Sequence, residues 1–227
     1  LKTGIKDIIV NESSGILDFS SKLIPGLYQG MMNINTIERY LDEINNLDLV
    51  KFNTNEIINL GNVRTCDVTN NIKVKNVATY INSLCVYKIN DKYKTDFYID
   101  ESIIFDKNVT TKSFKEHLTV YNKFPELLKA ENKDFRNEID INYFKNVLRF
   151  ESRFANFELM RKSFNVKDLT LLNVLNSKEK VNYNILNRIT DLSSINIDTI
   201  NNFKTLIEMK EKYIYSKIRN IQGDLSI

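Results

Sequence analysis

The 227-residue chain contains little cysteine, a single histidine and no long apolar run. Its two cysteines, Cys66 and Cys85, lie far apart, which excludes a zinc knuckle or a disulfide framework and predicts small buried side chains. No apolar stretch approaches the roughly 20 residues of a membrane-spanning helix. The first four residues lack the apolar core of a signal peptide. They begin with Leu1, which fits an alternative start codon or a trimmed N-terminus equally well. We therefore expect a cytoplasmic protein.

The composition is that of a globular protein, with 42% hydrophobic and 27% charged residues. The net charge is only +3, but residues 107–167 carry thirteen Lys or Arg against eight Asp or Glu. This local basic excess is a mild indication of a polyanionic partner, although solvated surfaces often carry a similar excess.

Hydrophobic periodicity predicts an α+β protein. The ranges with strand-like alternation are 15–24, 61–72, 93–99, 102–107, 114–122 and 146–154, and those with helical spacing are 33–46, 74–87 and 125–132. Beyond about residue 158 the pattern is helical, over 169–175, 181–189 and 197–219. We expect a central antiparallel sheet of about five strands with helices on one face. This α+β domain would span residues 1–155, and a helical C-terminal extension would span 156–227.

One predicted strand places a tyrosine on a polar face. His117, Thr119 and Tyr121 alternate with Leu118 and Val120, so the first three would point away from the core. A tyrosine displayed in this way is either a packing residue of a half-buried strand or a nucleophile.

Two further predicted strands carry polar rows of their own. Arg149, Glu151 and Arg153 alternate with apolar residues in one of them, and Asp67 lies between two threonines in the other. If these strands are neighbours of the tyrosine strand, their rows form a single polar surface.

Three segments resemble the plasmid and filamentous-phage replication initiators of the gene II/X type. They are HLTVYNKFPELL (117–128), NVLRFESRFANFELMRKSFNV (146–166) and VRTCDVTNNI (63–72), which match that family in order and spacing over roughly residues 60–175. The resemblance implies an HUH-endonuclease-like fold, with the sheet face opposite the helices forming a DNA cleft. It also implies a rolling-circle initiator that nicks one strand of an origin, stays joined to the 5′ phosphate through a phosphotyrosine, and rejoins the ends.

On this resemblance Tyr121 matches the nucleophilic tyrosine of the family. A phenol keeps its proton at neutral pH, so it needs assistance to act as a nucleophile. Lys123 would help the phenol to lose its proton or would bind a phosphate, unless it is simply a solvated lysine. Arg149 is similar to the arginine that precedes the family's glutamate, and we expect it to bind DNA together with Arg153.

The resemblance also implies a divalent cation, Mg²⁺ or Mn²⁺, beside the scissile phosphate. The broader superfamily usually binds this ion with two histidines one residue apart, which a chain with only His117 cannot provide. We therefore expect the carboxylates of Asp67, Glu126 and Glu151 as ligands, with His117 as a possible fourth. Alternatively, Glu126 only favours the first turn of a helix, Glu151 only pairs with the flanking arginines, and His117 is an ordinary polar strand residue.

The expected partners are single-stranded and origin DNA, with a host helicase as a further candidate. We expect no membrane and no small-molecule cofactor, and we place the protein in the cytoplasm of a bacterial host cell. The alternative function is a catalytically inactive regulator of replication that binds single-stranded DNA on the same fold. An unrelated α+β interaction protein is a third possibility. Both DNA-related functions require Asp67, Tyr121 and Glu151 on one face of adjacent strands.

Overall fold

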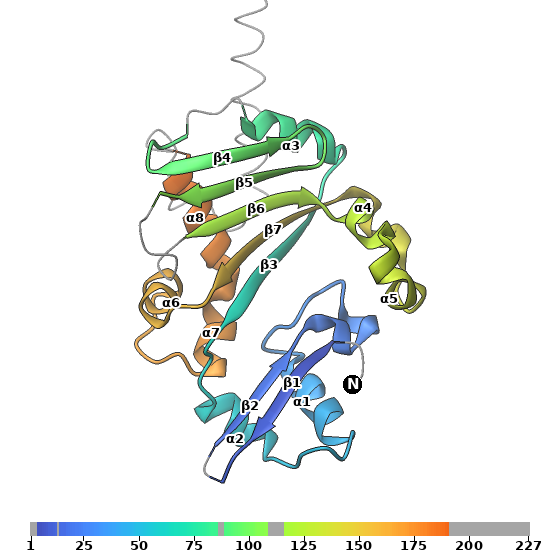
Figure 1. Ribbon diagram of the computed structural model, residues 1–227, viewed down its shortest axis with the longest axis vertical. Helices are drawn as coiled ribbons and strands as arrows, with labels where there is room; N and C mark the ends of the chain where they lie inside the picture. Colours follow the sequence, from blue (N-terminus) through green and yellow to red (C-terminus); the bar gives the residue numbers. More distant parts are fainter. Residues whose placement is uncertain (1–3, 13, 86–88, 109–115, 191–227) are drawn as a thin grey trace, which may run out of the picture. The chain divides into compact units, whose positions relative to one another are not determined.

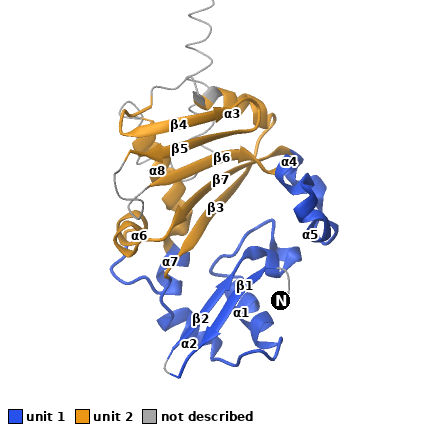
Figure 2. Ribbon diagram, viewed as in Figure 1, with its two compact units in different colours: residues 1–63, 124–145, 166–176 blue, residues 64–123, 146–165, 177–227 orange. Residues whose placement is uncertain are grey.

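The computed structural model describes residues 4–12, 14–85, 89–108 and 116–190, which fall into two compact units. Figure 2 colours the units separately. The first, which we call the hairpin unit, comprises residues 1–63, 124–145 and 166–176. The second, the sheet unit, comprises residues 64–123, 146–165 and 177–227. Each unit is therefore built from segments that are distant in sequence.

The hairpin unit is named after two antiparallel strands, β1 (Ile5–Val10) and β2 (Gly15–Phe19). Short 3-10 helices follow at Ser21–Leu23 and Pro25–Leu27. The remaining helices of this unit, shown in Figure 1, are α1 (Ile37–Asn45), α2 (Thr54–Leu60), most of α4 (Lys123–Leu128), α5 (Lys133–Asn137) and most of α7 (Leu171–Ser177), with 3-10 helices at Ala130–Asn132 and Ile141–Asn146.

The core of the hairpin unit forms around α1. Ile37, Tyr40, Leu41 and Ile44 are all buried, and their spacing places them on one side of the helix. They pack in two clusters, which also contain the buried residues Ile5, Leu23 and Leu175. The apolar stripe of the predicted 33–46 helix is confirmed, except that Ile34 precedes the helix and is exposed.

The sheet unit contains five antiparallel strands, in the spatial order β3-β7-β6-β5-β4 (Figure 1). Their bounds are β3 Cys66–Lys73, β4 Tyr93–Tyr98, β5 Ser102–Lys107, β6 His117–Asn122 and β7 Val147–Phe154. The predicted α+β architecture with a five-stranded antiparallel sheet is confirmed.

One face of this sheet is apolar and buried. The buried side chains of this face include Val68, Ile72, Ile103, Phe105, Leu118, Val120, Leu148, Phe150 and Phe154. Three helices contact these strands, namely α3 (Val77–Cys85), α6 (Phe157–Phe164) and α8 (Val181–Ile189). The strand register places the polar rows on the opposite face of the sheet.

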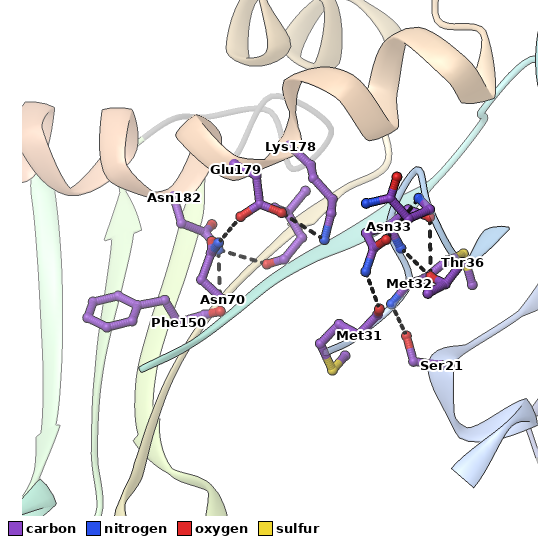
Figure 3. A network of polar contacts seen from close by, with 12 residues as sticks. Ser21, Met31, Met32, Asn33, Thr36, Asn70, Phe150, Lys178, Glu179 and Asn182 are labelled. Atoms are coloured by element: carbon purple, nitrogen blue, oxygen red, sulfur yellow. Dashed lines mark hydrogen bonds and ion pairs between the residues drawn. The ribbon is translucent and has the colours of Figure 1, made fainter. Parts of the chain in front are cut away.

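Helix α8 is fixed to the sheet by a buried amide, which Figure 3 shows in detail. The Asn182 Nδ2 atom donates to the main-chain oxygens of Val68, at 2.9 Å, and Phe150, at 3.3 Å. It also donates to the Asn70 Oδ1 atom at 2.9 Å. Asn182 is fully buried, so these bonds replace the water that its amide nitrogen loses on folding. One side chain thus joins a helix to two neighbouring strands.

The observed elements differ from the predicted ones mainly at their ends. The predicted strand 15–24 stops at Phe19, because Ser20 caps a 3-10 helix with its side chain. The predicted strand 61–72 begins only at Cys66. Strand β1 and helix α2 were not predicted. The helical segment predicted over 197–219 lies outside the described residues.

The division of the chain at residue 155 stays a prediction. Part of the expected C-terminal extension, helices α6 and α8, contacts the sheet. Within the described part of the chain, no helix combines the length and the apolar character needed to cross a membrane.

Candidate functional site on the polar face of the sheet

The three strands that carry the predicted site residues are neighbours in the sheet. Strand β7 lies between β3 and β6. Glu151 is opposite both Thr69 and Thr119, and Arg149 is opposite both Asn71 and Tyr121. Residues opposite each other on paired strands point to the same face. The predicted single polar surface is therefore confirmed.

We call this surface the polar face. It carries Asp67, Thr69 and Asn71 of β3, Arg149, Glu151 and Arg153 of β7, His117, Thr119 and Tyr121 of β6, and Asp106 of β5. Asp67, Tyr121 and Glu151 thus satisfy the geometric condition that both DNA-related functions require.

Tyr121 is held by a carboxylate and lies near an ammonium group. Its hydroxyl donates to the Glu151 Oε2 atom at 2.9 Å. The Lys123 Nζ atom lies 5.8 Å from the centre of the Tyr121 ring. Lys123 is only 3% exposed, so its charge acts in an environment that screens it less than water does. The predicted pair of Tyr121 and Lys123 is brought together.

The two predicted DNA-binding arginines have different environments. Arg149, opposite Tyr121, is only 3% exposed, and its Nε atom donates to the Asn71 Oδ1 atom at 2.9 Å. Arg153 has a side chain that is 77% exposed, and its Nε atom lies 3.9 Å from the Asp67 Oδ1 atom. An ion pair this exposed and this long contributes little to stability. Arg149 is thus a fixed group beside the tyrosine, whereas Arg153 remains open to solvent.

His117 forms contacts on both ring nitrogens. Its Nδ1 atom lies 2.6 Å from the Asp106 Oδ1 atom, and its Nε2 atom lies 2.8 Å from the Thr119 Oγ1 atom. A carboxylate can only accept here, so Nδ1 carries a proton, and in the neutral ring Nε2 then accepts the threonine hydroxyl proton. Asp106 therefore orients the imidazole.

Sequence reasoning missed Asp106 and Asn71. Both lie on strands that alternation predicted correctly, at positions opposite to the apolar face. That alternation was the available signal for Asp106, because Ile103 and Phe105 mark the core face of its strand. It could not say that this strand pairs with β6, which is what brings Asp106 to His117.

Glu126 does not belong to the sheet. It lies in α4, in the part that belongs to the hairpin unit. Its main-chain oxygen and its Oε1 atom both accept from the Asn132 Nδ2 atom, at 3.0 and 3.2 Å. The buried Asn132 in turn accepts from the Lys22 Nζ atom at 2.8 Å. A local structural role is thus visible for Glu126, and its role as a metal ligand stays a prediction.

The carboxylates on the polar face lie singly or in pairs, which limits the kind of metal site they could form. Among the described residues, no group of three or more His, Cys, Asp or Glu side chains gathers closely enough to hold an ion. Mg²⁺ often binds through one or two carboxylates and keeps several water molecules. Such a sparse site fits the carboxylates present, namely Asp67, Glu151 and the pair of Asp106 and His117. The described residues do not fit a site in which protein ligands alone enclose the ion.

Cys66 takes no part in this chemistry. Cys66 is the first residue of β3, and its sulfur lies 3.9 Å from the sulfur of Met160. Burial, with a smaller contribution from the Asp67 charge, raises the pKa of the Cys66 thiol to about 12. A thiol that keeps its proton is a poor nucleophile and a poor metal ligand. For Cys66 a structural role therefore remains.

The fold and the site define an α+β protein with a tyrosine and a glutamate paired on the polar face of an antiparallel sheet. Residues 31–182 match the family described as the N-terminal part of the phage replication-associated gene II protein. This match covers about two thirds of the chain and includes all five strands of the sheet. The chain therefore belongs to this family of phage replication-associated proteins, and it acts in replication initiation. The predicted family resemblance is confirmed. Comparisons with curated proteins and with solved structures gave no match.

Proposed function

We propose that this protein nicks and rejoins one DNA strand at a replication origin, with Tyr121 as the nucleophile. The observation that carries the proposal is the 2.9 Å hydrogen bond from the Tyr121 hydroxyl to the Glu151 carboxylate. A nucleophilic hydroxyl needs a base within hydrogen-bonding distance, and Glu151 occupies that position. Family membership supports DNA as the substrate.

In the proposed nicking step, the Tyr121 phenol transfers its proton to Glu151 as its oxygen bonds to the scissile phosphorus. The bond from phosphorus to the 3′ oxygen breaks, and that oxygen takes up a proton from water and leaves as a 3′ hydroxyl. The 5′ end stays joined to the protein as a phosphotyrosine. In the rejoining step a 3′ hydroxyl gives its proton to water and attacks the phosphotyrosine. The bond from phosphorus to the phenol oxygen breaks, and that oxygen takes back the proton from Glu151.

Two fixed cations support this chemistry. The Lys123 ammonium, 5.8 Å from the phenol ring, favours negative charge on the phenol oxygen. The Arg149 guanidinium is opposite Tyr121 in register, and its positive charge favours a phosphate beside the tyrosine. Both side chains are only 3% exposed, so their charges are held in place and are screened less than they would be in water.

We further propose Mg²⁺ or Mn²⁺ as the cofactor. When bound, such an ion would stabilise the negative charge that develops on the phosphate in the transition state. Asp67, Glu151 and His117 on the polar face are the proposed ligands. The role of Glu126, in the hairpin unit, stays a prediction. Since Glu151 has two carboxylate oxygens, it could accept from Tyr121 with one of them and hold the ion with the other.

The proposal predicts that Tyr121→Phe abolishes nicking. The assay uses a supercoiled plasmid that carries the replication gene with its flanking DNA, together with Mn²⁺. A denaturing gel then reports nicked circles and protein on the 5′ end. The control is Tyr143→Phe, because Tyr143 is a half-buried tyrosine in the hairpin unit. If Tyr121→Phe nicks as fast as the parent protein, the assignment of the nucleophile is wrong.

The alternative proposal is a catalytically inactive regulator that binds single-stranded DNA. The single histidine favours it, together with the lack of a three-ligand metal cluster among the described residues. This function predicts salt-sensitive binding of single strands without a metal requirement and without a covalent adduct. A metal titration followed by a denaturing gel distinguishes the two functions. A host helicase stays a prediction for either.

A further inference from the structure

An exposed aromatic ring lies at the end of the row that contains the proposed nucleophile. Tyr98 is opposite Ser102, Ser102 is opposite Tyr121, and Tyr121 is opposite Arg149. These four side chains therefore form one row that crosses the sheet on the polar face. Neighbouring strands are about 4.8 Å apart, so Tyr98 and Tyr121 are separated by about 10 Å. A short run of nucleotides spans that distance.

Tyr98 is available to a ligand. It is 53% exposed, whereas the core aromatic rings of the same sheet, Phe105 and Phe150, are fully buried. It ends β4, which is an edge strand of the sheet. The next residue, Ile99, is also exposed, so apolar surface continues beyond the ring.

The turn that carries Tyr98 is held in one conformation. The Asn82 side chain of α3 donates to the Asp100 Oδ1 atom at 2.7 Å and accepts from the Asp100 main-chain nitrogen at 3.0 Å. The Glu101 main-chain nitrogen donates to the Tyr98 main-chain oxygen at 3.1 Å. Asp100 has a φ of 63°, a strained conformation that these bonds maintain. The ring is therefore presented by a fixed turn.

The charges around Tyr98 indicate which part of a nucleotide it meets. Asp96, Asp100 and Glu101 are all exposed carboxylate residues close to it in the chain. Carboxylates repel a phosphate, but they leave the flat face of a neutral base unaffected. At the other end of the row, Arg149 provides the positive charge that a phosphate needs.

We propose that Tyr98 is a stacking platform for one base of single-stranded DNA, within a few nucleotides of the phosphate at Tyr121. This inference rests on the proposed function, because it takes the DNA to run along the row from Arg149 to Tyr98. Stacking of a base on an exposed aromatic ring is worth roughly 1–3 kcal/mol and does not depend on base identity. Tyr98 would thus position the strand without selecting its sequence.

The test measures binding of a fluorescent dT20 oligonucleotide in the full chain with Tyr121→Phe as background, so that no cleavage occurs. Adding Tyr98→Ala should weaken binding about 5- to 150-fold, and adding Tyr98→Phe should leave it unchanged. The matched control is Phe157→Ala, because Phe157 is 50% exposed but lies on helix α6. It should bind dT20 like the background protein.

A second measurement locates the stacked base. A series of dT20 oligonucleotides, each with one abasic position, is bound to the proteins with and without Tyr98→Ala. At one position the effects of the two changes should not add, because each removes one partner of the same stacking contact. Additive effects at every position, or equal weakening by Phe157→Ala, would overturn the inference.

The inference and the proposed function fail in different ways. If the parent protein forms the tyrosine adduct and Tyr98→Ala binds dT20 like its background, only the stacking role is wrong. If the background protein does not bind dT20 and the parent protein forms no adduct, the proposed function is wrong and the stacking role falls with it.

Discussion

At the scale of single residues, Glu151 combines two sequence-based expectations with one structural observation. It lies two residues from Arg149 and two from Arg153, which allowed either a metal ligand or an ion pair. In the structure its carboxylate accepts the Tyr121 hydroxyl at 2.9 Å. A carboxylate bonded to a phenol has the geometry of a proton acceptor.

A glutamine at position 151 tests this role. Glu151→Gln keeps an oxygen that accepts the phenol hydrogen bond, but the amide cannot take up the proton. We expect the single-turnover nicking rate to fall by roughly 10²- to 10⁴-fold, because that is the usual contribution of a general base. Binding of uncleaved dT20 should stay the same.

The control for this experiment is Glu158→Gln, which changes an exposed glutamate in the first turn of α6. It should nick at the parent rate. If Glu151→Gln also nicks at the parent rate, another group accepts the proton.

At the scale of elements, the attachment of helix α8 depends on Asn182. Its amide bonds to main-chain oxygens of β3 and β7, the two strands that carry Asp67 and Glu151. We expect Asn182→Ala to lower the free energy of unfolding by about 1–3 kcal/mol, because the buried carbonyl groups lose a donor. Urea denaturation followed by circular dichroism measures the change.

Asn184→Ala is the matched control for this prediction. Asn184 lies on the same helix and is only half-buried, so the two variants share the same change in helix propensity. We expect an effect within about 0.5 kcal/mol. Equal destabilisation by both variants would show that the bonds of Asn182 do not hold the helix to the sheet.

The sequence predicted the elements well where one face is buried. Strand β5 was predicted with its observed bounds. Ile103 and Phe105 are buried, whereas Ser102, Ile104 and Asp106 are only partly buried. Strand β1 escaped prediction because most of its side chains are only partly buried or exposed, so its pattern does not alternate.

Pairing between distant segments could not be read from alternation. The contact of Asp106 with His117 arises because β5 pairs with β6, and periodicity carries no information about neighbours. Glu126 shows the opposite case. It is close to Tyr121 in sequence, but it lies in a helix of the other unit, so proximity along the chain did not predict membership of the sheet.

At the scale of the whole molecule, each unit buries a tyrosine whose ionisation is coupled to folding. Burial raises the pKa of Tyr40, in the hairpin unit, to about 12. Burial, with the Glu116 charge as a smaller cause, raises the pKa of Tyr93, in the sheet unit, to about 12. Tyr93 donates to the Glu116 carboxylate at 3.2 Å, and Arg188 of α8 also bonds to that carboxylate.

These shifts predict that stability is lost in alkali. The pKa of each phenol is about 10 in the unfolded chain and about 12 in the folded one, so the unfolded state loses its proton first as the pH rises. The contribution of each buried phenol to the free energy of unfolding is fully present below pH 10 and is lost between about pH 10 and 12. Between pH 9 and 11 each phenol should cost on the order of 1 kcal/mol of unfolding free energy.

Urea denaturation at pH 9 and pH 11 measures this loss. The free energy of unfolding should fall less between pH 9 and pH 11 in Tyr40→Phe and in Tyr93→Phe than in the parent protein, by on the order of 1 kcal/mol. If the free energy of unfolding falls as much in both variants as in the parent protein, other groups cause the loss of stability in alkali.

The register of β7 between β3 and β6 also has an evolutionary consequence. Inserting or deleting one residue at the start of β7 would turn Glu151 toward the core and Phe150 toward the polar face, and would separate both from their present partners on β3 and β6. The chain between β6 and β7, residues 124–145, belongs to the hairpin unit and is free of this constraint. Differences in length among related phage proteins should therefore collect in such connections, while the three site strands change by substitution alone.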